Sequence, residues 1–307
     1  MNKRLGMLAA MTGTCIFGFS FMFSRIALTV ASPYVMLMYR FVLAFVTLNL
    51  LVGGLRLAGF NKDRKKTAQW LRFSLRGRNL LPLIVLGLVQ PVIYFLCESY
   101  GISLTNSTFS GVIIALSPIV GLALGAMFLR EYPTKAQVGF SFLSIAGVIL
   151  MTLQQTSDGV VKPLGVLLLV MAVLSGTSYN LLSRKASHFS ALEQTYVMMF
   201  IAAVCFTALA VWDCRTDLSL LLAPLSSLPF MTSVLYLSVF SSNIAFLSLN
   251  YANSMLPVAR VTSFCNLTTV ISLFAGVIFL HEPFGWVSLL ASIVIIIGVW
   301  GVQRKAR

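Results

Sequence analysis

Charged residues are scarce in this chain. They make up 10% of its 307 residues, whereas about a quarter of the residues in an ordinary soluble domain are charged. Hydrophobic residues make up 58%, and apolar runs of about 18 residues or more, long enough to cross a bilayer as a helix, recur along the chain. The composition excludes an ordinary soluble protein and predicts an all-α integral membrane protein in a lipid bilayer.

Metal-binding and disulfide patterns are also missing. The chain has five Cys and two His, and no Cys-x-x-Cys pair. Four of the cysteines fall in apolar runs, where a free Cys behaves as a small hydrophobic residue, and only Cys214 falls in a loop. Neither His188 nor His281 has a Cys nearby. We therefore expect no structural disulfide, no metal and no other cofactor.

Enzyme signatures are absent from the sequence as well. It contains no G-x-S-x-G, no H-E-x-x-H and no P-loop, and no pair of Asp residues lies within the apolar runs. The chain is therefore predicted not to be an enzyme. Without an ATP site, any uphill movement of a solute must draw on an ion or substrate gradient.

The net charge of +14 could suggest a nucleic-acid partner. The Lys and Arg residues, however, lie in short loops between apolar runs, where they report orientation in the membrane. We therefore predict no nucleic-acid partner.

Ten spans are predicted, and the loops between them leave no room for a soluble catalytic domain. The N-terminal run begins like a signal peptide, but it continues to about Val30 without a cleavage site and is interpreted as a retained first helix. The longest loop, 54–79, is basic. The expected spans are 5–29, 33–53, 80–100, 106–129, 135–153, 164–183, 193–212, 228–250, 257–280 and 284–302.

The distribution of positive charge predicts the orientation. With the N-terminus inside, the inner segments carry 17 Lys and Arg residues and the outer loops carry only Lys162 and Arg215. Cytoplasmic loops are enriched in these residues, so both termini are predicted to be cytoplasmic. The expected location is a cell membrane, most simply the inner membrane of a bacterium.

The sequence repeats itself. Phe-Leu-Arg-Glu at 128–131 recurs as Phe-Leu-His-Glu at 279–282, an offset of 151, and Ser-Arg-Ile-Ala at 24–27 recurs as Ser-Arg-Lys-Ala at 183–186. We predict two five-helix units, 1–153 and 164–307, and an odd number of spans makes them inverted repeats. The positive Arg130 and Lys135 become His281 and Trp286, as expected if the second copy faces the other way.

Inverted repeats place a substrate site near the bilayer midplane between the two halves, so polar residues within the spans are the candidates. Gln90, Tyr94 and Glu98 follow the spacing of one helical face. The predicted cavity residues are Arg40, Gln90, Tyr94, Glu98, Tyr179, Asn180, Asn243, Arg260, Asn266 and Thr269.

Structural alternatives stay open for these residues. Arg40 either anchors its helix to a carbonyl or headgroup, or meets an anionic substrate group or Glu98. Glu98 is either a solvated end residue or a ligand for a cation or a coupling proton. Arg260 is either interfacial or part of an inner gate. The Asn residues can instead form helix–helix hydrogen bonds, and the small residues of the fourth and ninth spans can serve packing.

The segment "ALSPIVGLALGAMFLREYPTKAQVGFSFLSIAGVIL" resembles the closing half of an EamA-type domain of the drug/metabolite transporter superfamily. Pro118, Glu131 and Gly147 match the pattern, Glu282 and Gly298 repeat it, and Tyr39–Phe41 resembles the family's Arg-bearing second helix. The resemblance covers essentially the whole chain and implies a secondary carrier that commonly exports amino acids or other small metabolites.

One feature departs from that pattern. The second copy has Thr268-Thr269 where the first has Ser117-Pro118, which predicts a weaker second kink. Glu131 and Glu282 lie at loop entrances, and we interpret them as helix-end contacts.

The predicted function is secondary transport of a small-molecule substrate by alternating access, in the outward direction. The alternatives are a non-transporting scaffold or receptor on a carrier fold, and a lipid-handling enzyme, for which no nucleophile or acid–base pair is evident. Oligomeric state is open, and a homodimer is compatible with the sequence.

Overall fold

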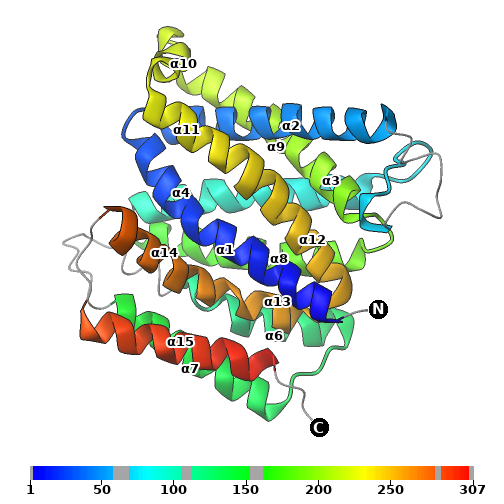
Figure 1. Cartoon of the computed structure of the whole chain (residues 1–307), viewed down its shortest axis with the longest axis vertical. Helices are drawn as coiled ribbons and strands as arrows, with labels where there is room; N and C mark the ends of the chain where they lie inside the picture. The colour runs from blue at the N-terminus through cyan, green and yellow to red at the C-terminus, as the bar shows by residue number, and fades with distance from the viewer. Residues whose placement is uncertain (1–2, 58–68, 105–112, 153–161, 281–284, 304–307) are drawn as a thin grey trace.

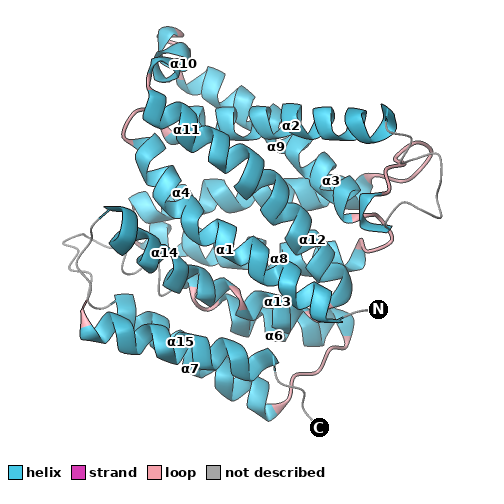
Figure 2. Cartoon of the chain, in the orientation of Figure 1, coloured by secondary structure: helices cyan, strands magenta, loops and turns pink. Residues whose placement is uncertain are grey.

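The computed structural model describes residues 3–57, 69–104, 113–152, 162–280 and 285–303. Helices are the only regular structure in those segments (Figure 2). Within them, seven helices are long and apolar enough to cross a membrane, and three shorter apolar helices lie at Ser117–Leu129, Lys135–Leu150 and Trp286–Val302. The predicted all-α class is confirmed for this part of the chain.

The first half of the chain contains two long helices followed by a divided one and two shorter ones (Figure 1). The predicted span 106–129 falls partly outside the described residues. The elements are α1 (Lys3–Leu28), α2 (Pro33–Leu57), η1 (Gln69–Leu71), α3 (Leu81–Gly87), η2 (Leu88–Ile93), α4 (Tyr94–Ser103), α6 (Ser117–Leu129) and α7 (Lys135–Thr152).

The second half follows a similar order, with two short helices added between its second and third long helices. Its elements are α8 (Pro163–Lys185), α9 (Ala191–Asp213), α10 (Ser219–Leu222), η3 (Ala223–Ser226), α11 (Leu228–Tyr236), η4 (Leu237–Ala245), α12 (Phe246–Met255), α13 (Val258–Ser263), α14 (Cys265–Leu280) and α15 (Trp286–Gln303).

Local sequence explains where several helices begin and end. Pro occupies the first turn of α3, α6, α8 and α11, where its missing N–H costs nothing. Ser190 and Glu193 form a capping box at the start of α9. Arg130 ends α6 in a left-handed conformation, with φ 56°.

The helices at the predicted third and eighth spans are interrupted by π-helical segments, η2 and η4, which the sequence reading did not predict. In η2, Gln90 leaves helical geometry (φ −143°, ψ 124°) ahead of Pro91, whose bond to Gln90 is cis. The Ser175 hydroxyl of α8 donates a hydrogen bond to the Val89 carbonyl beside this break, at 2.5 Å. A neighbouring helix thus satisfies a backbone group at the break.

The breaks in the fourth and ninth spans differ from the expectation. Pro118 does not kink a continuous helix, because α6 starts at Ser117 after a turn. The predicted ninth span is also broken, by a turn at Phe264 between α13 and α14. Thr268-Thr269 carry no kink, since both residues lie within the continuous helix α14, in agreement with the expected weaker kink at this position.

Close helix pairs organise the bundle. α7 packs against α15, α2 against α9, α4 against α8, and α1 against both α12 and α14 (Figure 1). A Cβ added at Gly298 of α15 would lie 2.6 Å from the backbone nitrogen of Ser144 on α7. Glycine there lets the two backbones approach closely.

The buried core has two main parts. The larger surrounds Phe41 of α2 and Phe206 of α9, whose rings stack with centroids 5.3 Å apart. The smaller surrounds Val148 of α7 and Ile295 of α15. The chain ends N and C lie on the same side of the bundle in Figure 1, together with the C-terminal end of α2.

Candidate functional site

Arg40 is buried in the bundle and holds two serines. It lies on α2 with 3% of its surface exposed. Its Nε donates to Ser242 Oγ and its Nη2 to Ser241 Oγ, both at 2.9 Å. A buried cation needs such partners, because leaving it unpaired away from water is costly. Arg40 therefore ties α2 to η4. The expected structural role was anchoring to a backbone carbonyl or a lipid headgroup, and the observed partners are instead serine side chains.

Aromatic rings cover the same guanidinium. Its Cζ lies 4.8 Å from the centroid of the Phe95 ring on α4 and 5.2 Å from that of Phe41. Cations are attracted to the faces of such rings. The rings and the serines together fix the guanidinium between α2, α4 and η4.

Glu98 is the acidic counterpart in this region. It lies on α4, is 8% exposed, and accepts a hydrogen bond of 2.7 Å from the Tyr94 hydroxyl. Arg40 is close enough to interact with it electrostatically. Among the ion pairs of the described residues, none joins Arg40 to Glu98. The direct pair considered from sequence is thus not formed in this structure.

Gln90 lies beside the same group. It is 9% exposed, and its Oε1 has no hydrogen-bond partner. Gly176 of α8 faces it: a Cβ there would lie 3.5 Å from Gln90 Oε1 and 3.1 Å from the Tyr94 ring. Asn180 donates to the Gly176 carbonyl at 3.0 Å. The structure thus brings Gln90, Tyr94 and Asn180 together around Gly176.

Cys265, at the start of α14, lies near this group. Cys265 is exposed, yet it is near enough to Tyr94 and Tyr179 to interact with both electrostatically. Thr269 lies one turn further along α14 and is half-buried.

The remaining predicted residues make contacts between helices. Tyr179 donates to Asn250 Oδ1 at 2.9 Å. Asn243 donates to the Ala44 carbonyl at 3.0 Å and to Thr47 Oγ1 at 2.8 Å. Asn266 donates to Ser144 Oγ at 2.9 Å. The polar ends of these three residues are therefore engaged in hydrogen bonds to other helices.

A second polar site lies at the bundle end that holds both chain termini. Glu131, just past α6, accepts a hydrogen bond of 2.9 Å from the Val258 N–H at the start of α13 and lies 3.5 Å from Arg184 of α8. Arg184 also donates to the carbonyls of Asn253 and Ser254 at the end of α12, at 3.1 and 2.9 Å. We call these five residues the Glu131 junction, and they agree with the interpretation of Glu131 as a helix-end contact.

Arg260 lies close to this junction along the chain. It is half-buried on α13, between the junction residue Val258 and the turn at Phe264. α13 also packs tightly on α6. A Cβ added at Gly121 of α6 would lie only 2.8 Å from Thr262 Cγ2 of α13.

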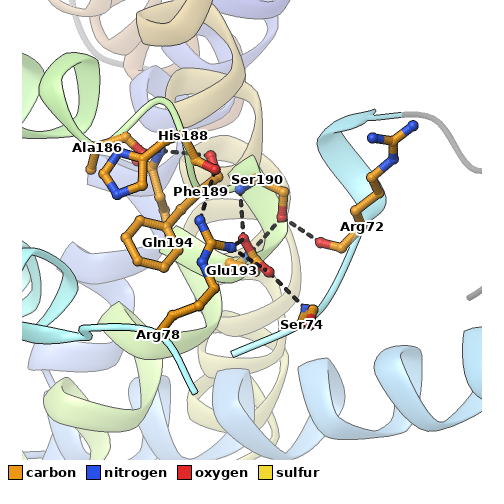
Figure 3. A network of polar contacts seen from close by, with 9 residues as sticks. All are labelled: Arg72, Ser74, Arg78, Ala186, His188, Phe189, Ser190, Glu193 and Gln194. Carbon is orange, nitrogen blue, oxygen red and sulfur yellow. Dashed lines mark hydrogen bonds and ion pairs between the residues drawn. The ribbon is translucent and has the colours of Figure 1, made fainter. Parts of the chain in front are cut away.

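A third network, drawn in Figure 3, fastens the segment before α3 to the turn between α8 and α9. The Glu193 carboxylate accepts hydrogen bonds from the Ser74 N–H at 2.7 Å and from Arg78 at 3.1 and 3.3 Å. Ser190 Oγ donates to the Arg72 carbonyl at 2.5 Å. The Arg78 guanidinium also lies 3.8 Å from the centroid of the Phe189 ring. We call segment 72–78 the strap.

Sequence reasoning missed some of the site's partners. Ser241, Ser242 and Phe95 are not among the predicted cavity residues. A pair of adjacent serines in an apolar run was the available signal. Its meaning depends on η4, because a π segment changes which residues of a helix share a face.

Comparison with known proteins gives the family. The EamA-like transporter family matches residues 4–153 and, again, residues 163–304. The chain belongs to the EamA-like transporter family. This places it in the drug/metabolite transporter superfamily, and the helices described above fit a multi-pass membrane protein.

Relatives of this EamA-like chain carry the same general description. It is 30% identical over 300 residues to YcxC of Bacillus subtilis (strain 168), named an uncharacterized transporter, which covers 96% of this chain and 91% of that one. An uncharacterized transporter of Archaeoglobus fulgidus is 23% identical, with 75% of this chain and 80% of that one covered. The family and these relatives identify a membrane transporter.

A solved crystal structure has the same fold. It matches the EamA-like chain with a TM-score of 0.76, covering 97% of this chain and 96% of that one at 15% identity. At this identity the likeness extends to the fold alone.

Proposed function

We propose that this protein is a secondary carrier that moves a small polar metabolite, such as an amino acid or a related compound, outward by alternating access. The observation that carries the proposal is the pair Arg40 and Glu98. Both are buried, and each is held by neutral groups rather than by the other. Ionisable residues inside a membrane bundle are costly and mark sites of function.

The proposed architecture is ten spans in two inverted five-helix repeats, 1–153 and 164–307. Seven long and three shorter apolar helices support this number, and the family match falls once in each half. The third span of each half contains a π segment. Corresponding helices of the two halves also make corresponding contacts across the halves. α4 of the first half packs on α8 of the second, and α12 of the second half packs on α1 of the first. An inverted pseudo-two-fold axis would produce these corresponding contacts.

The proposed binding site lies between α2, α4, α8 and α14. Arg40 would attract a substrate carboxylate, and Glu98 would attract an amine, with the Tyr94 hydroxyl beside it. Gln90, Asn180 and Thr269 would add polar contacts. Asn243, Asn266 and Tyr179 act at the border of the site by holding helices together through the hydrogen bonds described above.

Alternating access requires closure on one side at a time. The Glu131 junction is suited to close one end, because it joins the ends of α6, α8, α12 and α13. Arg260 on α13 would belong to the same inner gate. The distribution of Lys and Arg supports placing this end, and both chain termini, in the cytoplasm of a cell with the protein in its cell membrane.

Efflux from proteoliposomes tests the proposal. Vesicles are loaded with a mixed pool of amino acids and other small metabolites, and loss is read by mass spectrometry against protein-free vesicles. We expect selective loss of one compound class, abolished in Arg40→Ala and Glu98→Ala. Asp217→Asn is the control, because this carboxylate is exposed in the loop after α9. Normal efflux in both site variants would overturn the site, and no efflux with folded protein would favour a scaffold or receptor.

A further inference from the structure

Glu98 has the surroundings of a proton-binding group. Other acidic residues of the described spans lie at helix ends: Glu193 is in the first turn of α9, and Asp213 is its last residue. Glu98 is instead buried within the bundle, where the Tyr94 hydroxyl contacts it. A carboxylate in such a place is costly when charged unless it is well paired, and it becomes neutral by taking up a proton.

Its partners leave room for that proton. The Tyr94 hydroxyl donates one hydrogen bond to Oε1, and no hydrogen bond to Oε2 is formed within the described residues. One neutral donor compensates a buried carboxylate only in part. A proton on Oε2 would remove the charge without disturbing the Tyr94 contact.

The nearest cation is held away from Glu98. Arg40 gives its hydrogen bonds to Ser241 and Ser242 of η4 and lies over the Phe95 ring. Arg40 therefore stays compensated whether or not Glu98 is charged, so Glu98 can gain or lose a proton without leaving a buried cation unpaired.

The other titratable groups near Glu98 are few. Tyr94 on its own helix contacts it, Arg40 faces it from α2, and the Cys265 thiol of α14 interacts with Tyr94. α8, which packs against α4, brings the Tyr179 phenol, and its charged residues Arg184 and Lys185 lie in its last turn. Glu98 is the carboxylate of this group.

We infer that Glu98 is the coupling-proton site of the carrier, taking up a proton on Oε2 from one side of the membrane and returning it to water on the other. The step forms one O–H bond and later breaks it, with no change in oxidation state. Because the proton and a substrate amine would use the same carboxylate, each would displace the other, which couples inward proton movement to outward substrate movement. The role in coupling rests on the proposed function, whereas the binding of a proton to Glu98 does not.

Infrared spectroscopy of the purified full-length protein tests the proton site without substrate. During a pH titration in lipid nanodiscs, we expect a band from a buried protonated carboxyl group that Glu98→Gln abolishes. Glu98→Asp should keep a band at a shifted frequency, which shows that the site folds with a shorter carboxylate. Glu193→Gln should leave the band unchanged. A titrating band that survives in Glu98→Gln, or no titrating band in the parent protein, would overturn the proposal.

A second measurement addresses coupling. Proteoliposomes loaded with the amino-acid and metabolite pool also carry a trapped pH-sensitive dye, and efflux is compared with and without a pH gradient. We expect the gradient to accelerate efflux and the dye to report proton entry, with both effects lost in Glu98→Gln and kept in Asp217→Asn. Efflux without proton movement would overturn coupling and leave the carrier standing. A titrating Glu98 without any efflux would leave the proton site and overturn the proposed function.

Discussion

Glu131 and Val258 lie 127 positions apart in the chain, yet the Glu131 carboxylate accepts the Val258 N–H at 2.9 Å. This contact places a negative charge at the first turn of α13, where unsatisfied N–H groups favour anions. The same carboxylate lies 3.5 Å from Arg184. One side chain at the end of α6 therefore holds helices of the second half of the chain.

The two kinds of contact at Glu131 can be separated by substitution. Glu131→Gln removes the ion pair with Arg184 but keeps an oxygen for the Val258 N–H, so we expect a loss below about 1 kcal/mol in the free energy of unfolding for this partly exposed pair. Glu131→Ala removes both and should cost about 1–2 kcal/mol. Thermal unfolding in detergent measures the difference. Equal losses in the two variants would contradict the cap contact.

The strap depends on Arg78 and Glu193. Arg78→Ala leaves the Glu193 carboxylate, whose side chain is 4% exposed, without its ion pair, so we expect about 1–3 kcal/mol of destabilisation. Amide hydrogen exchange in residues 72–78 should become faster. Arg76→Ala is the matched control, since Arg76 is exposed two positions earlier. Unchanged exchange in Arg78→Ala would show that apolar packing alone holds the strap.

The serine pair of η4 should matter for Arg40. The double variant Ser241→Ala/Ser242→Ala removes both hydroxyl acceptors of the buried guanidinium. We expect the free energy of unfolding to fall by about 2 kcal/mol or more, and efflux to be lost. Ser238→Ala is the control, because Ser238 lies in the same segment and donates only to the Val234 carbonyl of its own span. Efflux and stability like the parent protein in the double variant would contradict a role for the serines.

The contact between α7 and α15 depends on Gly298. Alanine there would place its Cβ 2.6 Å from the Ser144 nitrogen, so the helices must separate and we expect a cost of about 1–3 kcal/mol. Gly139→Ala on α7 has no neighbour within 4 Å and should be neutral or slightly stabilising. Thermal unfolding of the two variants should therefore move in different directions, and a similar fall in both would contradict close packing at Gly298.

Hydrophobic pattern was enough to find most helices, because a bilayer span requires a long apolar run whatever its partners. α2, α8, α9 and α15 begin within a few residues of the predicted positions. The breaks were harder to find. Pro91 and Pro118 were visible in the sequence, but the turn at Phe264 carries no Pro or Gly and depends on how α13 and α14 pack.

The candidate site shows the same division. Polar residues in apolar runs singled out Arg40, Glu98 and Tyr94, since such residues are rarely placed in a span without a partner, and in the structure Arg40 and Glu98 are buried and Tyr94 is half-buried. Which partner each one takes could not be predicted. Arg40 bonds serines 201 and 202 positions away, and its alternative partner Glu98 bonds Tyr94, one turn earlier on its own helix. Such choices depend on tertiary packing.

Access to Cys265 from the two sides of the membrane tests alternating access most directly. The reporter protein keeps Cys265 and carries Ser at the other four cysteines, and membrane-impermeant thiol reagents are applied from one side at a time. We predict that the parent protein is labelled mainly from the outer side, and that Glu131→Ala, which opens the Glu131 junction, increases labelling from the cytoplasmic side and decreases it from the outer side. Labelling that rises from the cytoplasmic side without falling from the outer side, or does not change at all, would contradict a carrier that opens to one side at a time.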